Sequence, residues 1–143
     1  MKKAAAKGNA GTVRKAVEYI EAHLEEDLSL ERIAGELHYS GFYLERIFRR
    51  ETGLTLYQYI RGRRLTLAAR ALVETDRPVV EIACDARYGS QQAFTLAFSR
   101  LYHCTPAIYR KKGIFAPAQI RLRAFGSGLA CLLSFCQGGE MAA

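Results

Sequence analysis

An internal repeat constrains this chain more than any other feature of its sequence. The stretch from Leu30 to Thr55 returns in altered form from Val79 to Thr105, and matched residues lie 49 positions apart before Gly89 and 50 apart after it. The matched pairs are Ile33 with Ile82, Ala34 with Ala83, Tyr39 with Tyr88, Ser40 with Ser90, Leu44 with Phe94, Phe48 with Phe98, Arg50 with Arg100 and Thr55 with Thr105. A nearly fixed period of this length indicates one supersecondary unit that occurs twice.

Each copy predicts two short helices with a tight turn between them. In the first copy Ser29 and Ser40 can each cap a helix, and Gly53 ends the second one. In the second copy Pro78 suits a first helical position and Ser90 can cap the next helix. Helical spacing predicts that the buried faces consist of Leu30, Ile33, Ala34, Leu37, Leu44, Ile47 and Phe48 in the first copy and of Ile82, Ala83, Ala86, Phe94, Ala97, Phe98 and Leu101 in the second. In such a helix-turn-helix motif the second helix enters the major groove of DNA.

Two longer helices are expected outside the repeat. One lies near Thr12 to Glu26, with an acidic outer side and an apolar face of Val13, Ala16, Val17, Ile20 and Leu24. The other begins at Thr55, where Gln58 completes a capping box, and runs to about Glu74. Its apolar positions are Tyr59, Ile60, Leu67, Ala68, Ala71 and Leu72. About 20 residues of helix span ~30 Å, which approaches the roughly 34–36 Å of one DNA turn.

Together these elements predict an all-α fold with two helix-turn-helix subdomains joined by a long linker helix. The divisions are a flexible basic arm at 1–11, a first subdomain at 12–54, the linker helix at 55–75, a second subdomain at 76–112 that closes with a short helix after Thr105-Pro106, and a C-terminal extension at 113–143. The arm is interpreted as a solvated terminus, with a DNA-contacting arm as the alternative. For the extension, a docked helix, the remnant of an effector domain and a loosely packed or unstructured tail remain open, and residues 120–123 permit a short strand.

The charge distribution points to a polyanionic partner. The chain carries a net charge of +7, but residues 1–45 hold 6 basic and 8 acidic side chains and residues 46–143 hold 15 and 6. A basic body of this kind favours nucleic acid first and an anionic membrane second. The opening residues lack the apolar stretch of a secretory signal, and the longest apolar run is too short to span a bilayer. We therefore expect a cytoplasmic protein with no membrane partner, associated with the nucleoid when bound to DNA.

Neither a metal site nor a catalytic site is expected. Cys84 and Cys104 are interpreted as buried free thiols, and the four cysteines and three histidines match no zinc-binding spacing. An alternative is redox sensing by Cys131 and Cys136. No nucleophile–base or paired-carboxylate arrangement and no glycine-rich phosphate loop occurs, so we expect no enzyme activity and no cofactor.

Three stretches resemble a known family of regulators. Tyr39–Gly53, Gln58–Arg64 and Ser90–Phe98 resemble, in order and spacing, the DNA-binding domain of AraC/XylS transcription regulators, and most of all the small MarA/SoxS/Rob group. The resemblance covers roughly residues 12–112. It implies a sequence-specific transcription activator that binds double-stranded DNA as a monomer, places two recognition helices in successive major-groove segments, and contacts RNA polymerase. It also implies a role in stress or drug-resistance responses.

The resemblance also implies which residues contact DNA. Base contacts are expected from Phe42, Glu45, Arg46, Gln91, Gln92 and Thr95. Backbone contacts are expected from Ser40, Arg49, Arg50, Arg61, Arg63, Arg64, Ser90, Arg100, Arg110 and Lys111. Arginine suits guanine and glutamine suits adenine. The chain departs from the family at Phe42, Glu45 and Leu96, where the family has Trp, Gln and Arg, and at His38 and Arg87, where it has the glycines of the two turns.

Two other functions remain open on sequence grounds. The chain can be a regulatory module that binds a protein partner and has weak DNA specificity, an interpretation motivated by Glu45, Leu96 and the extension. It can also be the DNA-binding part of a larger ligand-sensing regulator. Binding measurements on several DNA sequences separate the first alternative from a sequence-specific regulator.

Overall fold

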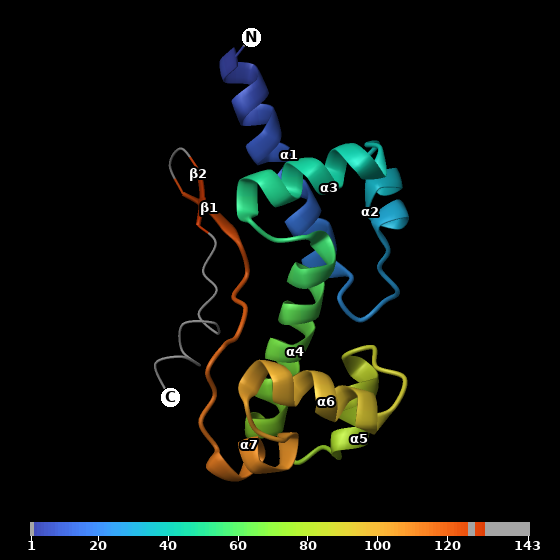
Figure 1. Cartoon of the computed structure of the whole chain (residues 1–143), viewed down its shortest axis with the longest axis vertical. Coiled ribbons are helices and arrows are strands. Elements are labelled where there is room, and N and C mark those ends of the chain that lie inside the picture. The colour runs from blue at the N-terminus through green and yellow to red at the C-terminus, as the bar shows by residue number, and fades with distance from the viewer. Residues whose placement is uncertain (1, 126–127, 131–143) are drawn as a thin grey trace. The chain divides into compact units, whose positions relative to one another are not determined.

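The computed structural model of the chain describes residues 2–125 and 128–130. Within them the elements are, in order, α1 (Lys2–Ala22), α2 (Leu30–Glu36), α3 (Gly41–Thr52), α4 (Leu56–Glu74), α5 (Val79–Asp85), α6 (Gln91–Tyr102), α7 (Pro106–Lys112), β1 (Arg123–Phe125) and β2 (Gly128–Ala130) (Figure 1). The two strands form an antiparallel hairpin in which Arg123 pairs with Ala130. The predicted all-α class is therefore confirmed, and this short hairpin is the one addition to it among the described residues.

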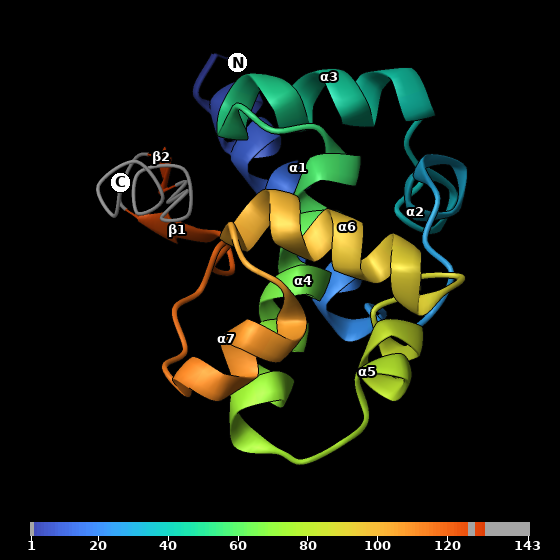
Figure 2. The same ribbon diagram turned by 60° about the horizontal axis from the view of Figure 1, so that its bottom comes forward.

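The described residues form two compact units. The first contains the chain up to Ile60 together with the segment that begins at Arg121, and the second contains Arg61 to Ile120. α4 is one continuous helix that contributes its first residues to the first unit and the rest to the second. Figure 2 shows α5, α6 and α7 gathered around the second part of α4. Each unit contains one copy of the sequence repeat.

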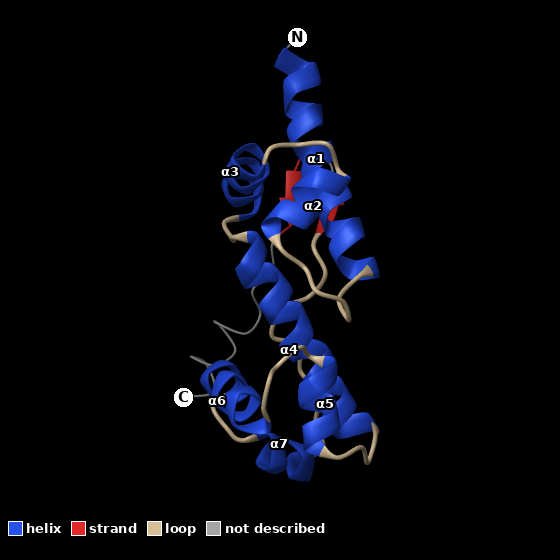
Figure 3. Ribbon diagram, turned by 90° about the vertical axis from the view of Figure 1, so that its right-hand side faces the viewer, coloured by secondary structure: helices blue, strands red, loops and turns tan. Residues whose placement is uncertain are grey.

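The core of the first unit is built from the faces that the repeat and the preceding helix predict. Its buried side chains include Val13, Ala16, Val17, Ile20, Leu24, Ile33, Ala34, Leu44, Ile47 and Phe48. Tyr59 of α4 is fully buried, and its ring centroid lies 5.9 Å from that of Phe48. The hydroxyl of Tyr59 donates a hydrogen bond to the Glu21 carboxylate at 2.8 Å, which ties α4 to α1. The hairpin lies against α1 and α3 in the same unit (Figure 3).

The core of the second unit is a single apolar cluster. It consists of Leu65, Ala68, Ala69, Leu72, Ile82, Ala83, Ala86, Phe94, Phe98 and Tyr109. These residues confirm the predicted inner positions Ile82, Ala83 and Ala86 of the segment around α5, and Phe94 and Phe98 of α6. Leu67, one of the apolar positions of the linker helix, is 39% exposed, whereas Leu65 is fully buried. Apolar residues occur on several sides of α4, so spacing alone does not select the buried side.

The helix α1 is longer at its start and shorter at its end than the sequence predicts. It begins at Lys2 rather than near Thr12 and ends at Ala22 rather than at Glu26. The structure therefore has a helix where the sequence predicts a flexible arm. Alanine and lysine, which dominate the first residues, are among the strongest helix formers, and the glycines Gly8 and Gly11 interrupt them only at a modest cost.

Both helix-turn-helix turns have the same backbone geometry despite the missing glycines. His38 and Arg87 adopt φ of 64° and 70°, in the left-handed region. The N–H of the next residue, Tyr39 or Tyr88, donates to Ala34 or Ala83 at 2.8 and 3.0 Å respectively. This is the Schellman motif, which normally has glycine at its left-handed position. The turns therefore form with non-glycine residues, at a steric cost.

The extension is partly described and partly outside the described residues. Ala118, Gln119 and Leu122 are each 3% exposed, so these three residues of the extension are packed against the rest of the protein. The strand permitted at 120–123 appears further on, as β1. The Cys131 and Cys136 pair lies outside the described residues.

The burial of the cysteines and the hydropathy of the helices were also predicted from the sequence. Cys84 is exposed and Cys104 is half-buried, so the expectation of a buried thiol is wrong for Cys84. Among the described residues, none of the helices has both the length and the apolar character needed to cross a membrane.

Candidate nucleic-acid interface

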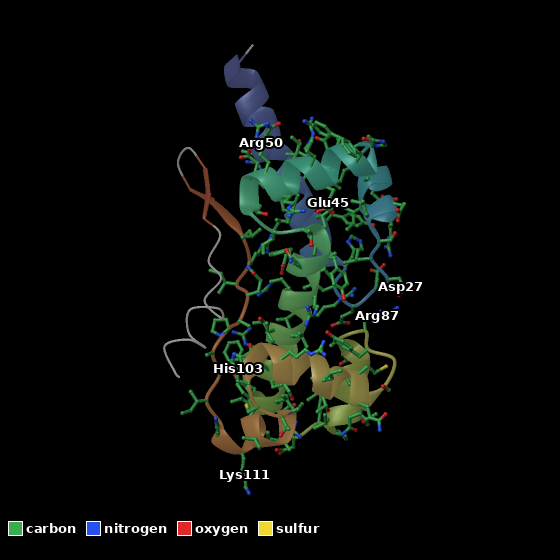
Figure 4. All side chains as sticks on the ribbon, viewed as in Figure 1. Asp27, Glu45, Arg50, Arg87, His103 and Lys111 are labelled. Carbon is green, nitrogen blue, oxygen red and sulfur yellow. The ribbon has the colours of Figure 1, made fainter. Side chains whose placement is uncertain are left out.

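The helix α3 has one buried side and one side directed to solvent. Leu44, Ile47 and Phe48 are buried, whereas Phe42 is 80% exposed and Arg46 is also exposed. Arg49 and Arg50 continue the exposed basic side toward the end of the helix, and Figure 4 labels Arg50. Because residues three, four and seven positions apart share a helix face, Phe42, Arg46 and Arg49 form one surface.

Caps at both ends fix the limits of α3. The Ser40 hydroxyl accepts a hydrogen bond from the backbone N–H of Tyr43 at 3.1 Å. Gly53 closes the other end with a φ of 81°, and its N–H donates to the Arg49 carbonyl at 2.8 Å. Both ends were predicted from the sequence and are confirmed.

The helix α6 repeats this arrangement in the second unit. Phe94 and Phe98 are fully buried, and Gln91 and Gln92 are exposed in the first turn. Leu96 is 55% exposed. Thr95 is half-buried and Arg100 is exposed, so the candidate residues of α6 lie mainly on its solvent side. Each repeat thus presents the solvent side of its second helix.

The ends of α6 match those of α3. The Ser90 hydroxyl accepts from the N–H of Ala93 at 3.1 Å, as Ser40 does in the first unit. At the other end His103 takes the place of Gly53, with a φ of 62° and its N–H 2.8 Å from the Ser99 carbonyl oxygen. Figure 4 labels Arg87 and His103, which lie before and after this helix in the chain. The first unit therefore closes its second helix without strain, and the second unit does not.

Among the charged candidates for DNA contact, Glu45, Arg63 and Arg110 hydrogen-bond backbone groups of the protein. Glu45 is half-buried, and its Oε2 accepts from the N–H of Leu56 at 3.3 Å, at the start of α4. The Nη1 of Arg63 donates to the Gln119 carbonyl at 2.8 Å. Arg110 donates to the carbonyls of Leu72, Thr75 and Arg77 at 2.9, 3.3 and 2.6 Å, so it caps one carbonyl in the last turn of α4 and holds the loop that follows the helix.

The remaining candidates lie on the surface of their elements. Lys111 is exposed, and Arg61 and Arg64 are half-buried along α4. The capping box predicted for α4 is confirmed, since Thr55 Oγ1 accepts from the N–H of Gln58 and the Gln58 side chain accepts from the N–H of Thr55, both at 3.0 Å. The N-terminus of α4 therefore receives three side-chain caps, from Thr55, Gln58 and Glu45.

In each repeat a salt bridge links the first helix, α2 or α5, to the segment that precedes it. In the first unit Arg32 of α2 bonds the Glu26 carboxylate at 2.7 Å, which lowers the pKa of Glu26 and raises that of Arg32. In the second unit a hydrogen bond to Asp85 raises the pKa of Arg77. These exposed pairs occupy arginines that sequence reasoning did not assign to DNA.

Two helix-turn-helix units with exposed second helices in one chain define the class of double helix-turn-helix DNA-binding regulators. A helix-turn-helix domain family matches residues 22–112. The chain is 41% identical over 112 residues to the transcriptional regulator Rob of Salmonella typhimurium, which covers 78% of this chain and 39% of Rob. It is 42% identical over 100 residues to the regulatory protein SoxS of the same organism, which covers 70% of this chain and 94% of SoxS.

A solved structure supports the same relationship. The C-terminal domain of AraT, a response regulator from Geobacillus stearothermophilus, matches with a TM-score of 0.69 and 33% identity over 73% of this chain and 88% of that one. The chain belongs to the AraC/XylS family, in the group that includes Rob and SoxS. The matched residues form a helix-turn-helix domain of this family, and the relatives named above are transcription regulators. It spans 39% of the length of Rob.

Sequence reasoning missed two structural features near the candidate site. One is the close approach of Gln119 to Gly62 of α4, which leaves no room for a Cβ atom at Gly62. The other is the role of Arg110 as a helix cap. A glycine inside a helical pattern was a usable signal for the first feature, because it often marks a close approach. No local pattern pointed to the second, because its partners lie more than 30 residues earlier in the chain.

Proposed function

We propose that this chain is a sequence-specific transcription activator that binds one asymmetric DNA site as a monomer. In this proposal α3 and α6 enter successive major-groove segments. The observation that carries it is the likeness of the two helices: each has a serine cap, a buried aromatic side and a solvent side with candidate base-reading residues. One chain therefore supplies both reading elements, and a two-fold symmetric site is not required.

Base contacts are assigned to the exposed residues of the two helices. Arg46 can form two hydrogen bonds with guanine O6 and N7, and Phe42 can pack against a thymine methyl group. Gln91 and Gln92 suit adenine N6 and N7. Thr95 is retained as a neighbouring contact. Glu45 is reassigned to the cap on α4.

Backbone contacts are assigned to groups that reach the surface. They are the helix N-termini at Ser40 and Ser90 and the side chains of Arg49, Arg50, Arg61, Arg64, Arg100 and Lys111. Helix N-termini and basic side chains are the usual phosphate donors in protein–DNA complexes. Arg63 and Arg110 are left out because their guanidinium groups bond backbone carbonyls.

Contact with RNA polymerase and activation of transcription are proposed from the family resemblance. A regulator of this kind acts where chromosomal DNA lies, so we also propose a cytoplasmic location and association with the nucleoid. A weakly specific module that binds a protein partner remains the competing hypothesis, and the experiment below separates the two.

Selection of binding sites from random DNA tests sequence specificity directly. We expect an enriched asymmetric site with a guanine in the half that α3 reads and adenines in the other half. Absence of any enriched sequence, together with weak binding to all duplexes, would support the competing module.

Replacement of Arg46 then tests the base assignment. Arg46→Ala should cost about 1–3 kcal/mol of binding free energy on the selected site and relax the preference at one guanine. Arg50→Ala, a matched arginine assigned to phosphate, should weaken selected and random DNA about equally. Binding isotherms at one salt concentration measure both. If the two variants lose affinity in the same pattern, the assignment of Arg46 is wrong.

A further inference from the structure

The residues after α7 form a packed segment that the helix-turn-helix family match does not include. That match ends at residue 112, and the segment, here called the strap, comprises residues 114–122. The strap has no regular secondary structure, yet three of its residues are only 3% exposed: Ala118, Gln119 and Leu122. Its residues up to Ile120 belong to the second unit, and Leu122 belongs to the first. Figure 1 shows it in orange to red after α7.

Hydroxyl groups of the second unit hold the backbone of the strap. The Tyr102 hydroxyl donates to the Ala116 carbonyl at 2.9 Å and accepts from the Ala118 N–H at 3.1 Å. The Tyr109 hydroxyl accepts from the Ala116 N–H at 2.9 Å. Burial raises the pKa of both phenols, so they stay protonated and can act as donors. The strap's polar backbone is therefore bonded without being part of a helix or sheet.

The helix α4 provides the deepest contact of the strap. Thr66 Oγ1 accepts from the Gln119 N–H at 2.9 Å, and Arg63 donates to the Gln119 carbonyl at 2.8 Å. In the first unit the Tyr59 hydroxyl accepts from the Leu122 N–H at 3.3 Å and donates to Glu21 of α1. The strap thus bonds residues that also organise the core of the first unit.

A glycine in α4 makes this close approach possible. A Cβ atom at Gly62 would lie 2.8 Å from the Cβ of Gln119 and 3.2 Å from its Cγ. Glycine is otherwise an unfavourable residue inside a helix. By contrast, a Cβ at Gly11 of α1 would meet nothing within 4 Å. The placement of Gly62 therefore matches the path of the strap, and the cost of the glycine is offset by the contact that it permits.

We propose that the strap completes the DNA-binding domain: docked on the Gly62 side of α4, it stabilises the fold and supports DNA binding by the first unit. The reason for the second effect is that Tyr59 joins the strap to α1 and that β2, which follows the strap, lies against α3. The effect on DNA binding rests on the proposed DNA-binding function, whereas the effect on stability does not.

The first test introduces a methyl group at Gly62 in the full chain. Gly62→Ala should lower the thermal midpoint by about 3 °C or more. The control Gly11→Ala should leave the midpoint unchanged or raise it, because alanine favours a helix and has free space there. Trypsin cleavage after Arg121, followed by mass spectrometry, should become faster in Gly62→Ala alone. Equal midpoints and cleavage rates for the two variants would overturn the proposal.

A second variant separates strap docking from simple damage to α4. Gln119→Gly removes the Cβ atom that the new methyl group would meet, whereas Gln119→Ala keeps it. In the Gly62→Ala background, Gln119→Gly should therefore restore part of the lost midpoint and the slow cleavage, and Gln119→Ala should not. Failure of Gln119→Gly to restore either property would show that Gly62 acts within α4 and not through the strap.

DNA binding is the third measurement. On a selected DNA site, Gly62→Ala should bind at least about 5-fold more weakly than the wild-type chain at a temperature where both are folded. Unchanged affinity would remove the link to DNA binding. If the wild-type chain binds no DNA, the proposed function fails, and the midpoint and cleavage results still decide the stability effect.

Discussion

At the scale of single residues, the two turns show how the chain departs from its family without losing the motif. His38 and Arg87 hold left-handed φ values at positions where the family has glycine. Non-glycine residues in this region pay a steric penalty between Cβ and the carbonyl oxygen. The backbone bonds around them keep the geometry of the Schellman motif. The backbone hydrogen bonds of the turn therefore hold these residues in a conformation that their side chains disfavour.

This strain predicts a stabilising substitution at the first turn. His38→Gly should raise the free energy of unfolding by about 1 kcal/mol, because glycine adopts positive φ without a steric penalty. His38→Ala keeps a Cβ and should give no such gain. Denaturant unfolding of the three proteins measures the difference. A stability of His38→Gly at or below that of His38→Ala would mean that the left-handed conformation carries no steric cost at this position.

Glu45 provides a second test at this scale. Glu45→Gln keeps an acceptor for the Leu56 N–H and removes a negative charge from the DNA-facing helix. We expect an unchanged thermal midpoint and a roughly 3- to 10-fold tighter complex at low salt, with the gain shrinking as salt screens the charge. Glu45→Ala, which removes the cap, should lower the midpoint. Weaker DNA binding by Glu45→Gln would return Glu45 to the base-reading residues.

At the scale of elements, helix positions were predictable and contacts between distant segments were not. The inner faces of α3 and α6 follow from spacing alone, and the caps at Ser40, Ser90 and Thr55 follow from residue type. The cap from Glu45 depends on a residue 11 positions later, and the bond from Gln119 to Thr66 joins residues 53 positions apart. Local patterns carry no information about such pairings, because they depend on how elements meet after the chain folds.

The tyrosines under the strap predict a loss of stability at high pH. Burial raises the pKa of Tyr102, so its folded-state pKa lies above the value of about 10 in the unfolded chain. The protonated phenol is favoured in the folded state. The stability that it contributes is therefore complete below about pH 10 and is lost as the pH rises through the folded-state pKa.

A matched pair of variants isolates this contribution. Tyr102→Phe should lower the thermal midpoint near neutral pH and reduce its fall at alkaline pH. Tyr57→Phe alters a side chain that is 70% exposed and should change neither. Thermal unfolding of the three proteins between about pH 8 and about pH 11 measures both effects. The same alkaline fall in Tyr102→Phe as in the wild type would assign the titration to other groups.

At the scale of the whole molecule, the two units are unequal partners in the proposed complex. The first has Arg46 on its exposed side with Arg49 and Arg50 beyond it, whereas the second has neutral Gln91 and Gln92. Charged donors form stronger hydrogen bonds than amides and also attract phosphate. The family resemblance could be predicted from the sequence because it lies in contiguous motifs. The difference in charge between the exposed residues of α3 and α6 could be predicted from the same motifs.

This inequality predicts how a selected DNA site responds to change. Scrambling the half read by α3 should cost more affinity than scrambling the half read by α6. Leu96→Arg should raise affinity and sharpen the second half, because Leu96 is 55% exposed and can be exchanged without opening the core. Binding isotherms at one fixed salt concentration on three duplexes measure both effects. Equal costs for the two halves, or an unchanged affinity for Leu96→Arg, would contradict the prediction.

The hydrogen bond from Leu122 of the strap to Tyr59 also affects the order in which the two units fold during synthesis. Domains generally fold from the N-terminus as they leave the ribosome. Here Tyr59 receives the N–H of Leu122 from 63 positions later, and the hairpin that lies against α1 and α3 follows Leu122. The second unit can form as soon as its residues up to Ile120 have emerged. The first unit, although its helices are translated earlier, receives Leu122 and the hairpin only after Arg61 to Ile120 of the second unit have emerged.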